Sequence, residues 1–585
     1  MPDKQKIRLA IEEGNYEGAA ELIKGYISEP GQYDDTIAIY DAAIGEACGD
    51  RKRMWEAIRS GLLKNCRNYE LYVMLGNYYL CENMHKSWLC YENALFYCDD
   101  MEDRAGIRAM MDQLEREYGI FVNKVAVVIL SYNLLEYTKS CIESIRKTTP
   151  ESAREIIVVD NASEDGSAEW LKKQKDIILV ANKENMGFPA GCNQGIRAAG
   201  KVSDIFLLNN DTLLAENALF WLRMGLYDKE KNGAAGSMSN YAPYDQSVCG
   251  DDATVPGLLD FGRRMNIPEE YPYESRLFLI GFALLIRRPV VDEVGLLDER
   301  FSPGQWEDVD YGLRIVLAGY RNVLCKNSFI LHYGGQSFGK NEKKSQALIE
   351  RNQKILNEKW GLEVLSHSPI VKLIQYAQEP EEAPIRILDI GCGCGASLGY
   401  AGSLYPNAEV YGVEKNPQAA KVASCMGTVV CGDVEETDLP WGEGFFDYVL
   451  MGEILEHLRD PEIVLKKINK CLKTGGHLIA SVPNMKHYSV LLPLLLEDRF
   501  SYGDGGILNS SHLKLYTGKE VSELLSRNGY TVEWMKYTLA AGEPKGEEAR
   551  VIRKLAEVTG EPSGTSMLAY QYIIKAAKAR EAANT

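Results

Sequence analysis

The sequence predicts an α/β protein of several domains, in which an α-helical, repeat-like region precedes two α/β domains. Residues 1 to about 118 carry apolar side chains at three- and four-residue spacing, the period of helices. From about 123 to 360, and again after 385, short β-branched runs alternate with helical stretches, which predicts strand–helix–strand units around mostly parallel sheets. A chain of 585 residues is also too long for a single hydrophobic core.

These patterns divide the chain into four segments. We expect a helical region at 1–120, a first α/β domain at 123–362, a linker at 363–384 and a second α/β domain at 385–578. The linker is predicted because residues 378–384 are acidic and contain two prolines.

Composition excludes several classes of function. The net charge of −18 argues against nucleic acid as a partner, because phosphate binding needs concentrated lysine and arginine. No apolar run is long enough to span a bilayer, and no signal peptide is visible at the N-terminus. The 14 cysteines lack framework spacing, which predicts reduced thiols. We therefore expect a cytoplasmic protein, either free or peripheral at the inner face of the membrane.

The helical region contains a motif of large and small residues. Tyr72, Leu75, Gly76 and Tyr79, followed by Tyr91 and Ala94, resemble a tetratricopeptide repeat, although the second helix is one residue short of the family period. Two roles follow with equal weight: a cap that stabilises the next domain, or a docking groove for a protein partner.

Acidic residues follow the buried strands of the first α/β domain. Asp160 comes directly after the run 155–159, and Asp211 follows the run 205–208. A further group, Glu307-Asp308-x-Asp310, stands beside an aromatic residue. Because ligands bind at the carboxyl ends of strands in an open parallel sheet, these carboxylates predict a binding site.

Ordered motifs then give the first domain a family resemblance. It resembles the family 2 glycosyltransferases of the GT-A fold, especially the rhamnosyltransferase-like members, over roughly residues 124–339. The motifs that carry the resemblance are Ser131-Tyr132-Asn133, Asp160-Asn161-Ala162-Ser163-x-Asp165-Gly166, Asn185-Met186-Gly187-Phe188, Asn209-Asn210-Asp211, Gly281-Phe282-Ala283, Glu307-Asp308-Val309-Asp310 and His332-Tyr333-Gly334-Gly335-x-Ser337.

The resemblance implies a nucleotide-sugar donor, UDP- or dTDP-linked, and a divalent metal, Mn²⁺ or Mg²⁺. It assigns the metal to Asp211 and His332, and makes Asp308 the base that deprotonates the acceptor, with inversion at the anomeric carbon. The family's Asp-x-Asp is represented by Asn209-Asn210-Asp211, which leaves one certain carboxylate. Glu307 and Asp310 are expected to position the acceptor or to pair with Arg314. The donor-binding residues that it implies are Ser131, Asn133, Asp160, Asn185, Gly187, Asn209, Asp211 and Glu307.

The second α/β domain begins with a glycine-rich turn. Gly391, Gly393 and Gly395 follow the predicted strand 386–389. Glu414 ends the next predicted strand, nineteen residues after Gly395. That distance suits an acidic residue on ribose hydroxyls, so a dinucleotide-binding domain is one alternative. The Gly-x-Gly-x-Gly spacing differs from the Gly-x-Gly-x-x-Gly of that fingerprint, and Asp433 is predicted to end a third strand.

With the later motifs Glu453-x-x-Glu456-His457 and Leu472-Lys473-Thr474-Gly475-Gly476, the domain resembles Rossmann-like class I S-adenosylmethionine-dependent methyltransferases, and among them small-molecule O-methyltransferases. The resemblance implies S-adenosylmethionine as cofactor. It places Asp389 and the glycines Gly391, Gly393 and Gly395 on the methionine side, Glu414 on the ribose and Asp433 at the adenine. His457 is the candidate base or, with equal weight, a histidine that caps or pairs locally with Glu456; His512 is a weaker candidate base.

The two resemblances together predict a bifunctional enzyme. It would transfer a sugar to a glycan, a lipid-linked glycan or a protein acceptor and would O-methylate the glycan, with the helical region available for a protein partner. The alternative is a glycan-assembly scaffold, in which the glycosyltransferase domain is degenerate and the methyltransferase acts on a small molecule.

Overall fold

The computed structural model describes residues 4–27, 33–248, 250–334, 342–362, 369–539, 544–561 and 564–579. The chain divides into two compact units, Met1–Lys359 and Trp360–Thr585, which are described separately. Gly335 and Ser337 of the last motif of the first domain lie outside the described residues.

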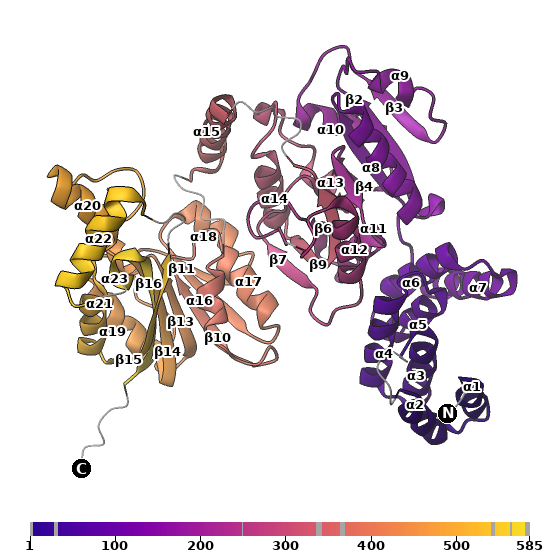
Figure 1. Ribbon diagram of the computed structural model, residues 1–585, viewed down its shortest axis with the longest axis horizontal. Coiled ribbons are helices and arrows are strands. Elements are labelled where there is room, and N and C mark those ends of the chain that lie inside the picture. The colour runs from indigo at the N-terminus through magenta and orange to yellow at the C-terminus, as the bar shows by residue number, and fades with distance from the viewer. Residues whose placement is uncertain are drawn as a thin grey trace. The chain divides into compact units, whose positions relative to one another are not determined.

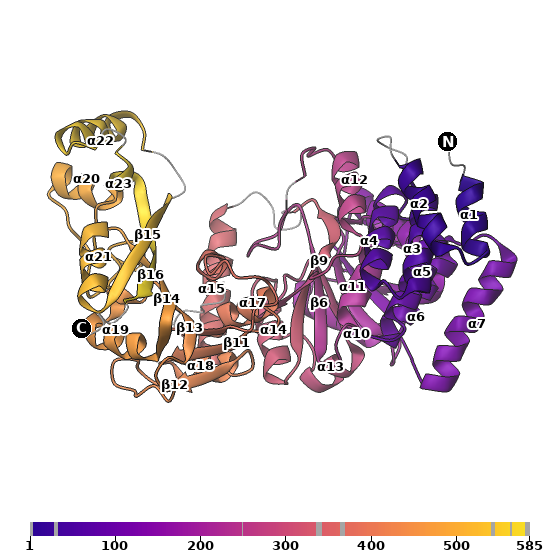
Figure 2. The same cartoon turned by 90° about the horizontal axis from the view of Figure 1, so that it is seen from below.

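The first unit begins with a helical region whose consecutive helices pack on one another (Figure 2). Asparagine and aspartate side chains cap several helix starts, and Gly49 ends α3 in a left-handed conformation. A Cβ on Gly76 of α5 would lie 2.3 Å from the Tyr91 ring of α6, so the predicted small residue does pack against the predicted large one. The helices are α1 Lys4–Glu12, α2 Tyr16–Tyr26, α3 Asp35–Cys48, α4 Arg51–Lys64, α5 Tyr69–Tyr79, α6 Met84–Tyr97 and α7 Met101–Tyr118.

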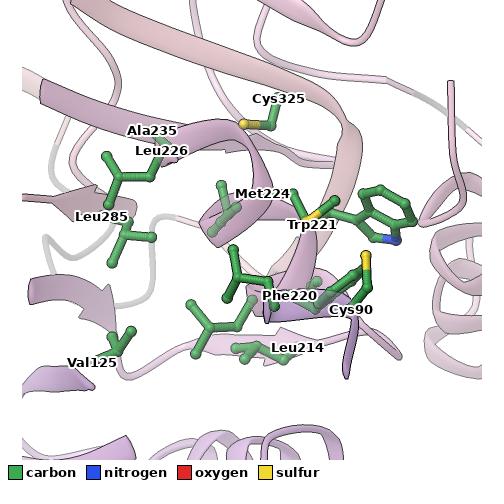
Figure 3. Close-up of a cluster of buried hydrophobic side chains, with 14 of the residues drawn as sticks. Cys90, Val125, Leu214, Phe220, Trp221, Met224, Leu226, Ala235, Leu285 and Cys325 are labelled. Carbon is green, nitrogen blue, oxygen red and sulfur yellow. The ribbon is translucent and has the colours of Figure 1, made fainter. Parts of the chain in front are cut away.

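The helical region shares a hydrophobic core with the α/β domain that follows it. Cys90 of α6 lies in the same cluster as Phe220 and Trp221 of α11 and Val125 of β1 (Figure 3). Burying this apolar surface is the main favourable term that holds the two parts together.

Polar contacts add specificity to this interface. Glu92 forms a buried ion pair with Arg223, and Lys86 Nζ lies 2.9 Å from Asp228 Oδ1. Asn217, at the start of α11, donates to the Cys66 carbonyl oxygen at 2.9 Å. This packing fits the first predicted role, a cap that stabilises the next domain; partner binding by the helices stays a prediction.

The α/β domain of the first unit is built on a sheet with the order β3-β2-β1-β4-β8-β6-β9-β5, and β7 also pairs with β9. Figure 1 labels β2, β3, β4, β6, β7 and β9 of this sheet. Strands β1, β2, β3 and β4 are parallel, so their carboxyl ends lie at one edge. The strands are β1 Val125–Ser131, β2 Arg154–Asp160, β3 Ile177–Ala181, β4 Asp204–Asn209, β5 Thr212–Leu214, β6 Asn232–Met238, β7 Tyr273–Arg276, β8 Ala283–Ile286 and β9 Arg321–His332.

Helices cover both faces of this sheet, which explains its continuous apolar strands. Val125, Val127 and Ile129 of β1 join the core shared with the helical region, whereas Ala126 and Val128 pack on the opposite side. The helices are α8 Leu135–Thr148, α9 Ser167–Leu171, α10 Phe188–Ala198, α11 Ala218–Leu226, α12 Val255–Met265, α13 Arg288–Val294, α14 Glu307–Leu317 and α15 Glu342–Trp360, with 3-10 turns η1 Glu151–Ala153 and η2 Glu299–Phe301.

The second unit contains a sheet with the order β12-β11-β10-β13-β14-β16-β15. The first five strands of this order are parallel, and β16 is antiparallel to both of its neighbours. The strand order reverses at β10, the point at which open α/β sheets bind ligands. The strands are β10 Arg386–Ile390, β11 Glu409–Glu414, β12 Thr428–Cys431, β13 Phe446–Gly452, β14 Leu472–Pro483, β15 Tyr530–Leu539 and β16 Ala569–Lys578.

Two helical layers enclose the second sheet. Helices α19 and α21 pack on one face, and α16 and α17 pack on the other. The helices are α16 Val371–Gln375, α17 Ala396–Leu404, α18 Pro417–Ala423, α19 Pro461–Cys471, α20 Tyr488–Glu497, α21 Gly518–Arg527, α22 Gly546–Val558 and α23 Thr565–Leu568, with the 3-10 turn η3 Leu455–His457. A multidomain α/β fold with a helical N-terminal region is thereby confirmed.

Two local observations bear on the predicted boundaries. Helix α16 lies within the predicted linker, and its Leu373 and Ile374 are buried in the second unit. Strand β12 ends at Cys431, so the expectation that Asp433 ends a strand is wrong by two residues. Among the described residues, no helix combines the length and the apolar character needed to cross a membrane.

Candidate active sites

The first candidate site begins where β1 and β2 end. Ser131 and Asp160 are register partners at these strand ends, and both are buried. Asp160 Oδ2 accepts a hydrogen bond from the Ser163 amide at 3.1 Å, whereas its Oδ1 is buried without a partner. Asn133, in the left-handed conformation, accepts from the Glu164 amide at 2.9 Å. An unpaired buried carboxylate oxygen is costly, so Asp160 is suited to a ligand that donates hydrogen bonds.

Asn161 connects this strand end to the predicted residues Asn185 and Gly187. Its Nδ2 donates to Asn185 Oδ1 at 3.1 Å and to the Gly187 carbonyl oxygen at 3.3 Å. Gly187 has φ 80°, and a Cβ there would lie 2.9 Å from Pro303 Cα, so a glycine is required. The structure thus brings Asp160, Asn185 and Gly187 together through Asn161, to which the sequence analysis assigned no role.

The predicted metal residues meet at the ends of β4 and β9. His332 Nε2 lies 3.3 Å from Asp211 Oδ1 and 3.5 Å from Asn209 Nδ2. Asn210 turns away, because its Nδ2 donates to Thr138 Oγ1 at 3.0 Å. Of the motif 209–211, only Asn209 and Asp211 therefore contact His332.

Hydrogen bonding fixes the tautomer of His332. Its Nδ1 lies 3.0 Å from the Tyr241 carbonyl oxygen, which can only accept, so Nδ1 carries the proton. Nε2 then carries the lone pair, and it lies beside Asp211 Oδ1 and the Asn209 side-chain nitrogen. A carboxylate beside an oriented imidazole nitrogen is a donor set that fits a divalent cation.

Glu307 and Asp308 lie at the N-terminus of α14. Asp308 Oδ2 accepts from the Gly281 amide at 3.1 Å and Oδ1 from the Val309 amide at 2.8 Å. Burial raises the pKa of Asp308; burial and then the charge of Asp308 raise the pKa of Glu307. Glu307 Oε2 is buried without a partner. Two desolvated carboxyl groups in one place are typical of acid–base chemistry.

Residues 281 and 282 join Asp308 to the metal residues. The Gly281 amide holds Asp308, while the next residue, Phe282, stacks on the His332 ring with centroids 5.0 Å apart. The Phe282 carbonyl oxygen also accepts from the Asn209 amide at 2.9 Å. One dipeptide thus fixes the predicted base and the predicted metal pair in a single site.

Asp310 has a structural role, since its Oδ2 accepts from Arg314 Nε at 3.0 Å and its Oδ1 lies 2.6 Å from Lys359 Nζ. Of its two predicted roles, the structure thus shows the pairing with Arg314.

Asn352 of α15 is a supporting residue that the sequence analysis missed. It is fully buried, and its Nδ2 lies within 3.0 Å of the carbonyl oxygens of Phe301, Gly304 and Gln305 in the loop before α14. An asparagine in the middle of a charged helix was the available signal, because asparagine favours turns over helix interiors.

The second candidate site is formed by the glycine-rich turn after β10. Gly391, Gly393 and Gly395 all have positive φ, and a Cβ on Gly395 would lie 2.8 Å from the Ala423 Cα. Asp389 is buried in β10, and burial together with Glu414 raises its pKa to about 8. This turn places bare backbone at the switch point of the sheet, which fits close approach of a ligand.

Glu414 fastens the same turn. Its Oε2 accepts from the Gly393 amide at 2.9 Å, and its Oε1 accepts from the Asn416 amide at 2.8 Å. Each oxygen keeps a further lone pair for a hydroxyl donor. Asp433 is half-buried and accepts from the Glu435 amide at 2.9 Å, and the preceding Gly432 amide donates to the Glu414 carbonyl oxygen at 2.9 Å.

His457 lies in η3, beyond the end of β13, and is half-buried. Its Nδ1 lies 3.1 Å from the Ser511 carbonyl oxygen, which leaves Nε2 unprotonated. Burial lowers the His457 pKa. Its ring meets the ring of His512 edge to face, with centroids 4.8 Å apart. The structure thus brings together the two histidines that the sequence analysis treated as separate candidates.

Family models match both α/β domains. The glycosyl transferase family 2 model matches residues 126–246, and a methyltransferase domain model matches residues 365–533. The chain combines a family 2 glycosyltransferase domain with an S-adenosylmethionine-dependent methyltransferase domain.

Relatives of known name agree with each part. The glycosyltransferase domain is similar to glycosyltransferase GlyG of Streptococcus pneumoniae, 29% identical over 217 residues that cover 36% of this chain and 70% of GlyG. It is also similar to the N-acetylglucosaminyl-diphospho-decaprenol L-rhamnosyltransferase of Mycobacterium tuberculosis, 23% identical over 241 residues, 37% of this chain and 77% of the relative. The methyltransferase domain is similar to ajmaline N-methyltransferase of Rauvolfia serpentina, 28% identical over 112 residues, 18% of this chain and 38% of that enzyme.

Proposed function

We propose that the chain transfers a sugar from a nucleotide-sugar donor to a glycan-bearing acceptor and O-methylates the glycan. The observation that carries the first half is the Asp211–His332 pair held next to Asp308 by residues 281 and 282. The second half rests on the glycine-rich turn fastened by Glu414 in the same polypeptide. Tethering two active sites raises the effective concentration of a shared product, which gives the fusion a physical reason.

In the glycosyltransferase domain, Asp160 and the asparagines around it would hold the nucleoside. Asp211 and His332 would hold a divalent cation, which when bound neutralises charge on the departing diphosphate. Asp308 would accept the proton of the acceptor hydroxyl, and one base with direct attack gives inversion at the anomeric carbon. Its two amide donors hold the carboxylate in place for this transfer.

In the methyltransferase domain, Asp389, the glycines and Glu414 would bind S-adenosylmethionine, which when bound supplies an electrophilic methyl group. The remaining work is alignment of an acceptor oxygen and removal of its proton. His457 presents an unprotonated Nε2, which is the form that a base requires.

A polyprenyl-linked glycan is the acceptor class that the rhamnosyltransferase relative suggests, because that enzyme's name specifies a decaprenol-linked acceptor. With such an acceptor the protein would work in the cytoplasm, at the inner face of the membrane. A protein acceptor remains the second expectation, with the helical region as its docking surface.

Hydrolysis of UDP- and dTDP-sugars by the full chain tests the first half. We expect slow turnover of one donor with Mn²⁺ or Mg²⁺, none with chelator, and a decrease of at least about 100-fold in Asp211→Asn, because a preorganised charge contact to the leaving group is lost. Asp292→Asn, an exposed carboxylate of the same domain, is the matched control and should retain full turnover. Absence of both turnover and nucleotide binding would instead support a scaffold with one working methyltransferase.

The pH profile of sugar transfer is a second test. Burial raises the Asp308 pKa above the ordinary value of about 4, and the base acts only when deprotonated. We therefore expect kcat/KM to rise with pH through this raised pKa and then to level off. A profile that is already flat at the pKa of an exposed aspartate would contradict the assignment of Asp308 as the base.

A further inference from the structure

We propose that Glu456, His457 and His512 of the methyltransferase domain form a binding site for a divalent transition-metal cation. The three side chains present one carboxylate and two imidazoles, and their ligand atoms all lie within 4.8 Å of one another. Metal–ligand bonds of about 2.1 Å in a tetrahedral site place ligand atoms about 3.4 Å apart, so binding needs these atoms to approach by up to about 1.4 Å.

Both histidines are oriented as metal ligands. His512 Nδ1 lies 2.8 Å from the Ile507 carbonyl oxygen, and His457 Nδ1 lies 3.1 Å from that of Ser511. Since a carbonyl oxygen only accepts, both protons are on Nδ1 and both Nε2 atoms have free lone pairs. Backbone carbonyls that fix a histidine in this way are the usual support of metal-binding imidazoles.

Glu456 is the independent observation that points to a ligand. Its side chain is 1% exposed, and neither carboxylate oxygen has a hydrogen-bond partner among the described residues. A buried carboxyl group without any donor is costly. A cation held between Glu456 and the two imidazoles would remove this cost.

The negative charges around Glu456 also favour a bound cation. The carboxylate of Glu453 acts on Glu456 as a second negative charge in the same place. A divalent cation balances both carboxylates and also satisfies the Nε2 lone pairs.

The ligand types indicate which cations fit. Two imidazoles and one carboxylate favour Mn²⁺, Fe²⁺, Co²⁺ or Zn²⁺ over Mg²⁺, which prefers oxygen ligands. Three protein ligands leave coordination positions open, and His457 is only half-buried, so the cluster is accessible to a small polar group.

The position of the cluster suggests its use. Glu456 and His457 follow β13, the strand next to β10 and its glycine-rich turn. A Cβ on Gly391 would lie 2.2 Å from Ile454 Cδ1, so the turn and the segment before η3 are in contact.

The role of the cation in catalysis rests on the proposed O-methylation. An acceptor hydroxyl bound at the open position would lose its proton to water, since a cation lowers the pKa of a bound hydroxyl. Its oxygen would then form the C–O bond as the C–S bond of the methyl donor breaks. His457 would in this case bind the cation instead of the proton.

Cobalt binding tests the site without reference to activity. The full chain carrying Asp211→Asn and His332→Gln, which removes the candidate metal pair of the glycosyltransferase domain, is titrated with Co²⁺ alone. We expect one equivalent to bind, with visible absorption bands from imidazole coordination. Adding His512→Gln or Glu456→Gln should weaken binding at least about 10-fold and abolish the bands.

His477→Gln is the matched control, because His477 lies in the same domain and pairs with Glu533, away from the cluster. It should bind Co²⁺ as the parent does. No stoichiometric binding by the parent, or binding that survives both His512→Gln and Glu456→Gln, would overturn the proposal.

S-adenosylmethionine binding, measured in the same variants, separates this proposal from the proposed function. Retained S-adenosylmethionine binding with lost Co²⁺ binding supports the metal site. If Co²⁺ binds as expected but no glycan is methylated, the metal site stands and the assignment of the acceptor fails.

Discussion

Asp308→Asn is expected to lower glycosyl transfer by a factor of about 10³, within the range of about 10² to 10⁴ for loss of a general base. The asparagine is close in size and still accepts one hydrogen bond, but it cannot take the acceptor proton. Donor binding should persist, because Asp160, Asn185 and the Asp211–His332 pair lie on other elements. Single-turnover transfer assays and calorimetric titration with the nucleoside diphosphate measure the two effects.

Two comparisons show whether the loss is chemical. S-adenosylmethionine binding by the same variant reports whether the rest of the chain is intact. Glu307→Gln is the neighbouring substitution, and it should weaken transfer less than Asp308→Asn does. The assignment would be wrong if Asp308→Asn lowered the transfer rate and the donor affinity by the same factor. It would also be wrong if Glu307→Gln lowered the transfer rate more than Asp308→Asn does.

Glu414→Ala should weaken S-adenosylmethionine binding by about 100-fold. The carboxylate accepts hydrogen bonds from the Gly393 and Asn416 amides and is expected to accept two more from the ribose hydroxyls. Two charge-assisted hydrogen bonds to the ligand contribute about 3 kcal/mol to its binding free energy. Glu409→Gln is the matched control, because Glu409 begins the same strand, β11, and is exposed. Calorimetry on the full chain measures both variants.

The same substitution tests the bifunctional proposal in cells. Mass spectrometry of glycans from cells that carry Glu414→Ala should show the added sugar without the mass of the methyl group. Glycans with unchanged methylation would mean that the methyltransferase domain acts on a different molecule.

Many residues of the two sites could be predicted because they follow the ends of recognisable strands. Asp160 and Asp389 stand within or just after short β-branched runs, and parallel strands bring such positions to one edge of a sheet. The glycine-rich turn was equally readable, since positive φ at three nearby positions requires glycine. Asp433 was misplaced relative to its strand because strand boundaries are weakly encoded by local pattern.

Residues that act through distant contacts were harder to recognise. Asn352 lies 47 to 51 residues from the carbonyl groups that it holds, and His512 lies on a segment remote in sequence from His457. No periodicity links such positions, so their partners depend on how the helices and loops close over the sheet.

The sequence by itself indicated the order of the domains and the two glycine- and carboxylate-bearing strand ends, because strand pattern and motif spacing are local properties of the chain. The two classes of reaction followed from the resemblance of its motifs to two families. Tertiary structure decided which atoms face one another. Asn210 turns away from His332, and Asp310 pairs with Arg314. The potential ligand atoms of Glu456, His457 and His512 lie close to one another. These outcomes depend on side-chain direction and on the burial of polar atoms, which are fixed only when the separate elements pack together.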